Sequence, residues 1–392
     1  MLDALNQCKP ELGRQIPKQL PGSVIDDGAL AEAIQIAWAE CQAAVLAGDK
    51  DRLRDLHVQA KAHDSEVSYS DLRRLYARRR QYFPQPAKID PSRIDPILVP
   101  VQQRSLEGDL FRVARGYWSM PFSKGYGRRL RFLLMDRHHE AVIGVIGLQS
   151  PSADLACRDK YLGVDKARKL AIVNNTLDAY TVGAMPAYAP LLGGKLVAGM
   201  LCSNKIRQAY WRTYGDKVTT LRQQRIPQPL IAITTASAFG RSSIYNRLRF
   251  HDRLLAEPIG YTKGFGTVHL EHLYPLMTDW LKSHGQHVPA GFGRGPKVRW
   301  QNIMRALLGL GVPRKCLAHG IQRQVFLFSL VRNLDQVCNE AATASPIDFD
   351  DDAWTAYWQE RWCGPRVARD PDWLCVDTHA LFERAFAHGN QR

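Results

Sequence analysis

Apolar residues recur at helical spacing through the first 80 residues. The stretch 28–49 is rich in alanine, and the Gly48-Asp49 pair closes it. Residues 51–64 and 68–83 continue as helices, the second with Ser70 or Asp71 as its expected N-cap. Five prolines between residues 84 and 100 then forbid a continuing helix and mark a linker. We therefore expect a helical N-terminal domain over residues 1–95.

Beyond the linker the pattern changes to short apolar runs. Residues 128–136 and 140–149 predict two adjacent strands, and a third is expected at 177–185. A loop with proline and glycine then opens a helix that ends at Gly215. An apolar strand (228–239), a short helix (242–250) and a glycine-bearing strand or hairpin (259–270) follow. This alternation predicts an α/β (α+β) domain over residues 96–275.

The final third of the chain returns to helical spacing. Residues 300–311 and 316–341 are expected to be helices, joined by Val312-Pro313. The acidic segment 345–358 and the tryptophan-rich stretch after it complete a C-terminal helical cap over residues 276–392. Its tryptophans are expected to pack rather than bind a ligand.

Positive charge is concentrated in the middle of the chain. The whole chain has a formal net charge of +15, whereas residues 101–344 hold 34 Lys and Arg against 15 Asp and Glu, a net of +19. Dispersed cations favour a polyanion through counterion release, so nucleic acid, and DNA in the first instance, is the expected partner. The alternative is a basic protein without a polyanionic partner.

Two loops repeat one chemistry, in which a hydroxyl and a cation precede an aromatic residue between two glycines. They are residues 123–127 (SKGYG) and 262–266 (TKGFG). The glycines allow close backbone approach, so the lysines would contact phosphate and the rings would stack on bases. The alternative is a pair of tight turns with the rings in the core. The residues predicted to bind nucleic acid are Lys124, Tyr126, Arg128, Arg129, Lys195, Arg241, Lys263 and Phe265.

Other ligand chemistry is sparse. Gly193 and Gly194 precede a helix, whose exposed N–H groups could hold an anion or a cofactor phosphate, although no phosphate-loop fingerprint is present. The eight cysteines are scattered without Cys-x-x-Cys spacing, which favours reduced thiols in the cytoplasm, and we expect no metal. No apolar run has the length needed to cross a bilayer, so no membrane association is expected.

Several motifs resemble one family. The run 156–165 (ACRDKYLGVD), residues 173–175 (VNN), the Gly193-Gly194 loop and residues 238–248 (AFGRSSIYNRL) resemble the A component of Druantia anti-phage defence systems. The resemblance covers about residues 110–275, with weaker similarity over 298–338. It implies a bacterial defence role beside a large helicase and other subunits. Its motif residues form a candidate polar cluster, namely Arg158, Asp159, Asn174, Asn175 and Asn246.

The order of elements also resembles the GNAT acyltransferases. That resemblance implies a mixed sheet in which a glycine loop after the central strand grips acyl-CoA, and Tyr245 is placed as the catalytic acid that protonates a thiolate. The usual Arg/Gln-x-x-Gly-x-Gly spacing is missing, so we expect a non-catalytic binding protein without a cofactor.

The sequence leaves three functions open. The first is a nucleic-acid-binding component, and the second is an acyltransferase-type enzyme that uses acyl-CoA and acts on nucleic acid or protein. The third is a structural adaptor for other defence subunits, with a homo-oligomer left open. A nuclease variant would gather Asp159, Asp165 and Asp178 around a metal, but such residues are more often caps and surface ion pairs.

Overall fold

The chain is described here by a computed structural model that covers residues 26–62, 68–118, 120, 127–165, 168–218, 223, 225, 229–289 and 296–387. Two compact units divide it. One contains the described residues up to Ala37 together with Leu273–Cys316, and the other contains Trp38–His272 together with Leu317–Arg392. Residues 38–95 and 317–392 thus share a unit with the central region. The three-part division expected from the sequence stays a prediction.

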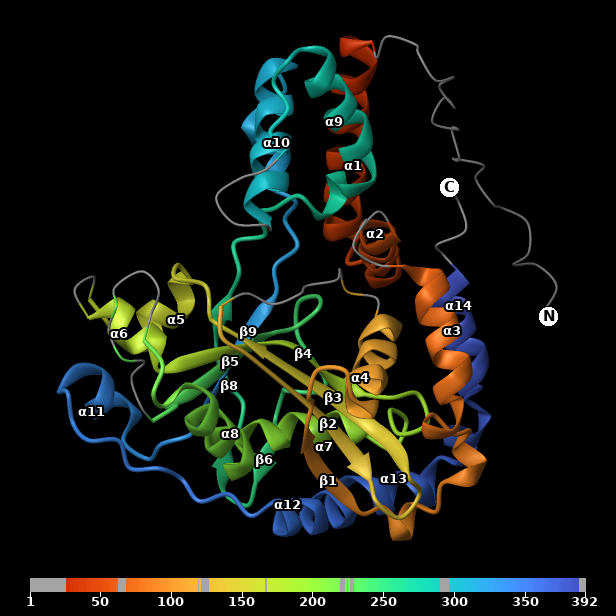
Figure 1. The fold of residues 1–392 in the computed structure, drawn as a ribbon, viewed down its shortest axis with the longest axis vertical. Coiled ribbons are helices and arrows are strands. Elements are labelled where there is room, and N and C mark those ends of the chain that lie inside the picture. Colours follow the sequence, from red (N-terminus) through yellow and green to blue (C-terminus); the bar gives the residue numbers. More distant parts are fainter. Residues whose placement is uncertain are drawn as a thin grey trace. The chain divides into compact units, whose positions relative to one another are not determined.

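A seven-stranded mixed sheet forms the centre of the larger unit (Figure 1). Its strand order is β1-β2-β3-β4-β5-β9-β8. Among these neighbours β4 and β5 run parallel, and the other pairs are antiparallel. The strands are β1 (Pro96–Pro100), β2 (Arg129–Asp136), β3 (Ala141–Gln149), β4 (Thr176–Ala184), β5 (Ala232–Ala236), β8 (Glu257–Tyr261) and β9 (Gln324–Ser329). The predicted mixed α/β fold is confirmed.

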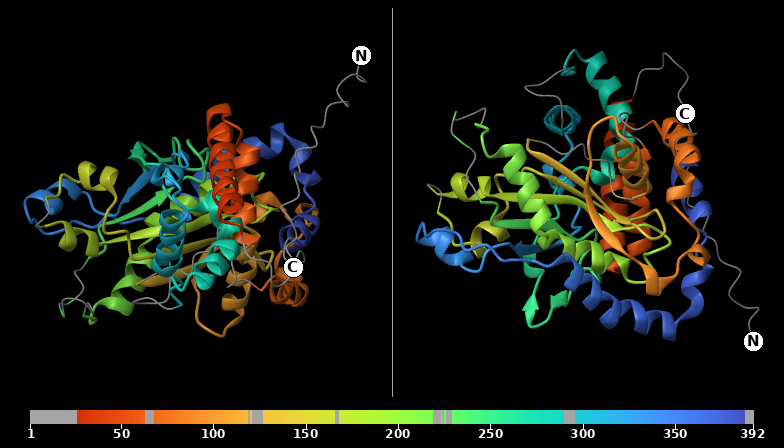
Figure 2. Two further views of the ribbon diagram at one scale, coloured as in Figure 1. Left: turned by 90° about the horizontal axis from the view of Figure 1, so that it is seen from above. Right: turned by 60° about the horizontal axis from the view of Figure 1, so that its bottom comes forward.

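Helices pack on both faces of this sheet. On one face α4 (Leu106–Tyr117) packs against β2 and β3, and on the other α7 (Gly193–Gly199) packs against β3 and β4. Figure 2 shows α12 (Asp351–Trp358) and α13 (Gly364–Arg369) running along the α7 side. The remaining helices of the unit are α2 (Lys50–Ala62), α3 (Tyr69–Arg79), α5 (Ala156–Tyr161), α6 (Lys169–Asn174), α8 (Asn204–Tyr214), α11 (Leu334–Asn339) and α14 (Thr378–Ala387).

Alternation along the strands sorts the side chains between the two faces. Leu148, Leu177 and Ile233 join the large core under α7. Gln149, Asp178 and Thr234 are their immediate neighbours along β3, β4 and β5, so they lie on the opposite face. The alternation therefore places Gln149, Asp178 and Thr234 in a row across three central strands.

Two tryptophans attach α12 to α7 and to the residue that precedes it. Nε1 of Trp354 donates to the carbonyl of Leu196 at 3.0 Å, and Nε1 of Trp358 donates to the carbonyl of Leu192 at 3.1 Å. Both rings are fully buried. Because each indole loses its water on burial, these two bonds satisfy its polar atom while the ring fills the core.

Four sequence predictions about elements were wrong. Residues 324–329 form a central strand rather than part of a helix, because a short apolar run fits a buried strand or a buried helix equally well. The proline linker contains edge strand β1, where missing N–H donors are tolerated. Ser68 rather than Ser70 or Asp71 caps α3, accepting from the N–H of Asp71. Residues 242–250 form turns and the short strand β6 (Arg249–Phe250), which pairs with β7 (Arg253–Leu254).

The smaller unit is helical. The start of α1 (Asp27–Ala47), α9 (Tyr274–Ser283) and α10 (Pro296–Gly309) contribute to it. Nε1 of Trp280 donates to Oδ1 of Asp27 at 2.6 Å and ties α9 to the start of α1. Across both units, no helix in the described part of the chain is long and apolar enough to span a bilayer.

Candidate functional site

The parallel strands β4 and β5 stay paired for only four residues. Thr176 to Ala179 pair with Ala232 to Thr235, and β4 then continues to Ala184 beyond this register. The carboxyl ends of parallel strands are common places for ligands, because the loops that follow them diverge. Functional side chains are therefore expected around this end of β4 and β5.

Asp178 lies at this place, between polar neighbours on both sides. Thr234 Oγ1 donates to its Oδ1 at 3.0 Å, and Gln149 Nε2 approaches its Oδ2 at 3.3 Å. Burial raises the pKa of Asp178, while these two hydrogen bonds and then the charges of Arg323 and Arg158 act in the opposite direction. The side chain nevertheless keeps some accessible surface. A buried carboxyl group with a raised pKa at the ends of parallel strands is a candidate functional group.

Buried polar atoms without partners lie close to Asp178 in the strands. Oε1 of Gln149 accepts no hydrogen bond from any part of the chain that the structure describes, although the residue is only 8% exposed. Oγ1 of Thr181, three residues after Asp178, is in the same condition. Each such atom costs free energy unless a ligand or water satisfies it.

Arg323 holds the region beyond the strand ends together. Its Nε donates to the carbonyl of Ser237 at 2.7 Å, and its N–H donates to Oγ1 of Thr262 at 3.1 Å. Burial lowers the pKa of Arg323, and the nearby Asp178 acts in the opposite direction. The guanidinium stays charged at neutral pH, so it supplies a fixed positive charge next to Asp178.

Two buried imidazoles surround the same guanidinium. Burial, followed by the charges of Arg323 and His319, lowers the pKa of His57 to about 3, and burial together with Arg323 lowers that of His319 to about 4. His57 stacks on Phe239 with ring centroids 4.6 Å apart. Both imidazoles are therefore neutral at physiological pH, and Arg323 provides the positive charge of this cluster.

The loop 262–266, predicted from sequence to bind nucleic acid, lies directly against this cluster. The N–H of Thr262 donates to the carbonyl of Arg323 at 2.9 Å, and the N–H of Gly320 donates to the carbonyl of Gly264 at 2.9 Å. Gly264 has φ +64°, and a Cβ there would come within 2.8 Å of Gly320, so this turn requires glycine. The loop is thus fixed beside Arg323.

Three of the predicted nucleic-acid-binding side chains are exposed at this edge. Lys263 and Arg241 are exposed, and the Phe265 ring is 47% exposed. Arg241 follows Gly240, whose N–H donates to the carbonyl of Gln322 at 2.9 Å. Hydrogen bonds therefore tie the segments that carry Arg241 and Lys263 to the strand entry at residues 322–324, on either side of Arg323.

Other predicted cations have structural partners. Arg128 is buried and donates to the carbonyls of Asn174 and Thr176 and to the hydroxyl of Tyr210. Lys195 donates to the carbonyls of Ile244 and Asn246 at 3.2 and 3.3 Å, and burial lowers its pKa. Arg129 is exposed on β2, whereas Lys124 and Tyr126 lie outside the described residues.

The motif polar cluster is held in separate local networks. Arg158 is fully buried, and its guanidinium donates to Asp159 and to the carbonyls of Ser152 and Ala153. Asp159 also pairs with Lys169 at 2.9 Å. Nδ2 of Asn175 donates to the carbonyl of Pro229, while the carbonyls of Asn174 and Asn246 accept from Arg128 and Lys195. These contacts shape the loops around β4 and β5.

The residues expected from the acyltransferase resemblance lie on the α7 side of the sheet. Tyr245 is buried against Phe326 and Phe328. Burial raises its pKa to about 12, while its hydrogen bond to Thr235 acts in the opposite direction. The N–H of Gly193 donates to the carbonyl of Tyr188 at 3.0 Å, and Gly194 approaches Ile244. The N–H of Gly193 is therefore already hydrogen-bonded within the protein.

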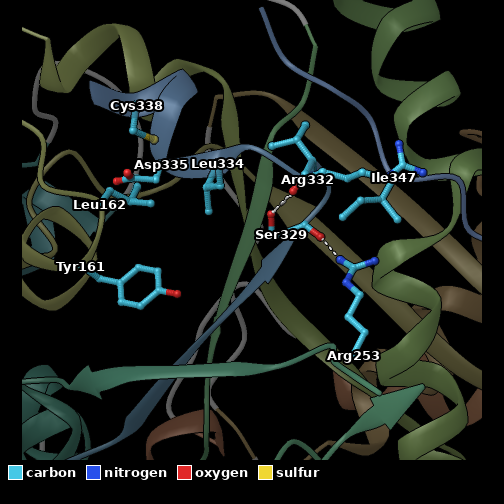
Figure 3. Close-up of a pocket in the computed structure, with 10 residues that line it drawn as sticks. Tyr161, Leu162, Arg253, Ser329, Arg332, Leu334, Asp335, Cys338 and Ile347 are labelled. Carbon is cyan, nitrogen blue, oxygen red and sulfur yellow. Dashed lines mark hydrogen bonds between the residues drawn. The ribbon is translucent and has the colours of Figure 1, made fainter. Parts of the chain in front are cut away.

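A separate cavity of about 600 Å³ lies near the opposite ends of the same strands (Figure 3). Tyr161, Leu162, Cys338 and Ile347 line it together with Arg253, Arg332 and Asp335. Arg332 donates to the carbonyl of Pro346 at 3.0 Å, and Arg253 donates to that of Ser329. Both cations are thus bonded to the backbone of the cavity wall.

Sequence reasoning missed most of the residues around Asp178. Asp178 was considered only as one of three metal ligands, but Asp159 and Asp165 are bonded elsewhere, to Arg158 and Lys169 and to the N–H of Arg168. Arg323 fell in a segment predicted to be helical, and Gln149 ends an ordinary apolar strand. The one feature of the sequence that could have indicated Gln149 and Arg323 is that each is a polar residue at the end of an apolar strand.

Comparison with known proteins decides the family. The family model described as Druantia protein DruA matches residues 47–340. This chain belongs to the Druantia protein DruA family. It is 35% identical over 341 residues to the Druantia protein DruA of Escherichia coli (strain UMEA 4076-1), an alignment that covers 85% of this chain and 84% of that protein. No solved structure matches the chain.

Proposed function

We propose that this DruA-family protein is a component of a Druantia anti-phage defence system and binds nucleic acid at the edge formed by residues 237–241, 262–266 and 319–324. Family membership supports the defence role and a place beside other subunits of the system. One observation supports the binding role. Hydrogen bonds join the segments that carry the exposed Lys263, Phe265 and Arg241 to the segment that contains Arg323.

The chemistry of this edge suits a single strand. Cations beside an exposed aromatic ring provide phosphate contacts and a stacking surface, a combination that tolerates any sequence. The net charge of +19 over residues 101–344 supplies the long-range attraction. A duplex would hide its base faces from Phe265, so we expect single-stranded DNA to bind more tightly than the matched duplex.

The framework follows the order of elements that resembles the GNAT acyltransferases, reused here for binding. Tyr245 supports this interpretation because it is buried against two phenylalanines, and Gly193 supports it because its N–H is already bonded to Tyr188.

The test is a fluorescence anisotropy titration of labelled single-stranded DNA at several salt concentrations. Wild type is compared with Lys263→Ala, Arg241→Ala and, as a matched control, Lys50→Ala, which removes an exposed lysine from α2. Each of the first two should lower the dependence of log affinity on log salt by about 0.7, the increment for one phosphate contact on a single strand, and the control should not. No binding by wild type at low salt would refute the proposal.

A further inference from the structure

A small basic cavity lies between α3 and α4, apart from the site described above. Its volume is about 270 Å³, and its walls are Asp71, Arg74, Leu75 and Arg78 of α3 and Arg112 of α4. The four residues of α3 follow one another at a spacing of one, three or four positions, so they share the side of the helix that lies beside α4. A water molecule takes about 30 Å³ in the liquid, so the cavity has room for a group of several heavy atoms.

The charge of this cavity is positive. Three guanidinium groups and one carboxylate line it, which gives a formal charge of +2. Arg74 pairs with Asp71, and the hydrogen bonds with Arg74 and then with Ser68 hold the pKa of Asp71 below its usual range. The charge of Arg112 acts on Asp71 in the same direction, so Arg112 lies close to this pair from the second helix. Asp71 therefore stays ionised and balances one of the three arginines.

The other two arginines, Arg78 and Arg112, are exposed and have no hydrogen bond or ion pair within the part of the chain that the structure describes. The neighbouring Arg79, by contrast, pairs with Asp109 at 2.9 Å. Arg78 lies in the last turn of α3, where a helix favours a cation, but Arg112 lies inside α4, where the helix dipole gives no such stabilisation. The repulsion between these like charges would be relieved by an anion in the cavity.

Phosphate is the anion that matches these groups. Arginine presents its N–H groups in a planar fork, which binds phosphate oxygens in pairs. A terminal phosphate carries about −1.5 to −2 charges at pH 7 and has three strong acceptor oxygens. It therefore offers an oxygen to each arginine and balances the charge of the cavity, whereas a phosphodiester inside a strand carries a single charge.

We propose that Arg74, Arg78 and Arg112 bind a terminal phosphate group, either that of a free nucleotide or that at the 5′ end of a nucleic-acid strand. The cavity shares no residue with the edge formed by residues 237–241, 262–266 and 319–324, so the inference goes beyond the proposed function. The three arginines act as binding residues, and no bond is made or broken in the cavity.

Isothermal titration calorimetry with thymidine 5′-monophosphate tests the cavity. The control ligands are thymidine, which lacks the phosphate, and thymidine 3′,5′-cyclic monophosphate, a diester with a single charge. The 5′-monophosphate should bind, the cyclic ester should bind about tenfold more weakly, as expected for the loss of one hydrogen bond to a charged group, and thymidine should give no heat. No heat with the 5′-monophosphate, or equal affinity for the two esters, would overturn the proposal.

Two variants locate the binding. Arg78→Gln and Arg112→Gln each remove a guanidinium without a partner in the described chain, so each should melt like wild type and bind the 5′-monophosphate about tenfold more weakly. Arg93→Gln changes an exposed arginine elsewhere in the chain and is the matched control, with wild-type affinity expected. Unchanged affinity in both cavity variants would place the phosphate elsewhere and overturn the assignment.

Oligothymidylate with a 5′-phosphate or a 5′-hydroxyl, labelled at its 3′ end, distinguishes the two sources of phosphate. If the strand end is bound, the phosphorylated strand should bind about tenfold more tightly in anisotropy, and Arg112→Gln should abolish that difference. Lys263→Ala should weaken both strands alike. Equal affinities of the two strands, together with heat from the 5′-monophosphate that Arg112→Gln reduces, would assign the cavity to a free nucleotide.

The same experiments separate this site from the proposed binding edge. If neither strand binds, the proposed function fails, but heat from the 5′-monophosphate that both cavity variants reduce would still support the cavity. If the strands bind and the 5′-monophosphate gives no heat, the cavity assignment fails and the proposed function stands.

Discussion

Gln149 and Asp178 face one another across β3 and β4, with Nε2 of Gln149 3.3 Å from Oδ2 of Asp178. Both residues belong to strands that are largely buried. A polar pair at the centre of a sheet lowers stability unless its hydrogen bonds are complete, and one acceptor of this pair remains open. Because Asp178 lies near Arg323, this pair is next to the basic edge that contains Arg323.

Phe265 should contribute base stacking to binding. We expect Phe265→Ala to weaken the binding of single-stranded DNA by about 1–3 kcal/mol, the range measured for stacking of one base on an aromatic ring. Phe265→Tyr keeps a ring and should retain the affinity. Anisotropy titrations at one salt concentration measure both, and equal affinities of the alanine and tyrosine variants would exclude stacking on this ring.

His57 should make stability depend on acidity. Its pKa is lowered to about 3 by burial and then by the charges of Arg323 and His319, so below pH 6.5 the unfolded chain binds a proton that the folded chain does not accept. The free energy of unfolding therefore falls as pH falls, by about 2–3 kcal/mol for this group between pH 7.5 and pH 4.5.

Denaturant unfolding at both pH values tests this account of His57. His57→Phe keeps a ring against Phe239 and should reduce the pH-dependent loss by about that amount, leaving the similar contribution of His319. His138→Phe, which changes an exposed imidazole elsewhere in the chain, is the matched control variant. An unchanged dependence in His57→Phe would show that His57 is not buried in neutral form.

Gly199 should be required by the packing of α7 against α12. A Cβ at Gly199 would come within 2.1 Å of Cζ2 of Trp354, whose ring is fully buried and bonded to Leu196. Gly199→Ala should lower the free energy of unfolding by about 1–3 kcal/mol through overpacking. Gly194→Ala, whose Cβ would approach the Ile244 side chain at 3.3 Å, is the control in the same helix and should cost less. Chemical denaturation compares them.

Tyr245 should contribute to stability and not to binding or catalysis. Its hydroxyl is buried and bonded to Thr235, so Tyr245→Phe should cost about 0.5–1.5 kcal/mol in unfolding free energy and leave the affinity for single-stranded DNA unchanged. Wild type should give no heat with acetyl-CoA in calorimetry. Acetyl-CoA binding that Tyr245→Phe alters would favour the acyltransferase alternative.

The sequence predicted the elements whose pattern is local. Helices at residues 28–82 and the strands at 128–136, 140–149 and 177–185 follow from periodicity alone. β9 was misassigned because its run of four apolar residues, Val325 to Phe328, carries no period, and its strand character comes from pairing with β5 and β8. Long-range pairing of this kind decides the identity of short apolar segments.

The site was predictable only where one segment carries its chemistry. The loop 262–266 contains its own cation and ring, so its sequence could be interpreted directly. Asp178, Gln149 and Arg323 are far apart in the chain, and only the sheet brings them together. Arg128 and Lys195 were predicted to bind phosphate because they lie in a basic region of the sequence. In the structure each of them donates to backbone carbonyls of the protein.

Photocrosslinking locates the residues that contact single-stranded DNA. A strand carrying 5-iododeoxyuridine is irradiated with the wild-type protein, and mass spectrometry identifies the crosslinked peptides. We expect crosslinks in the peptides that contain Phe265 or Phe239, and we expect these crosslinks to be reduced in Lys263→Ala and competed by unlabelled single-stranded DNA. Crosslinks confined to peptides of α11 to α14, with none at residues 237–266 or 317–324, would contradict this expectation.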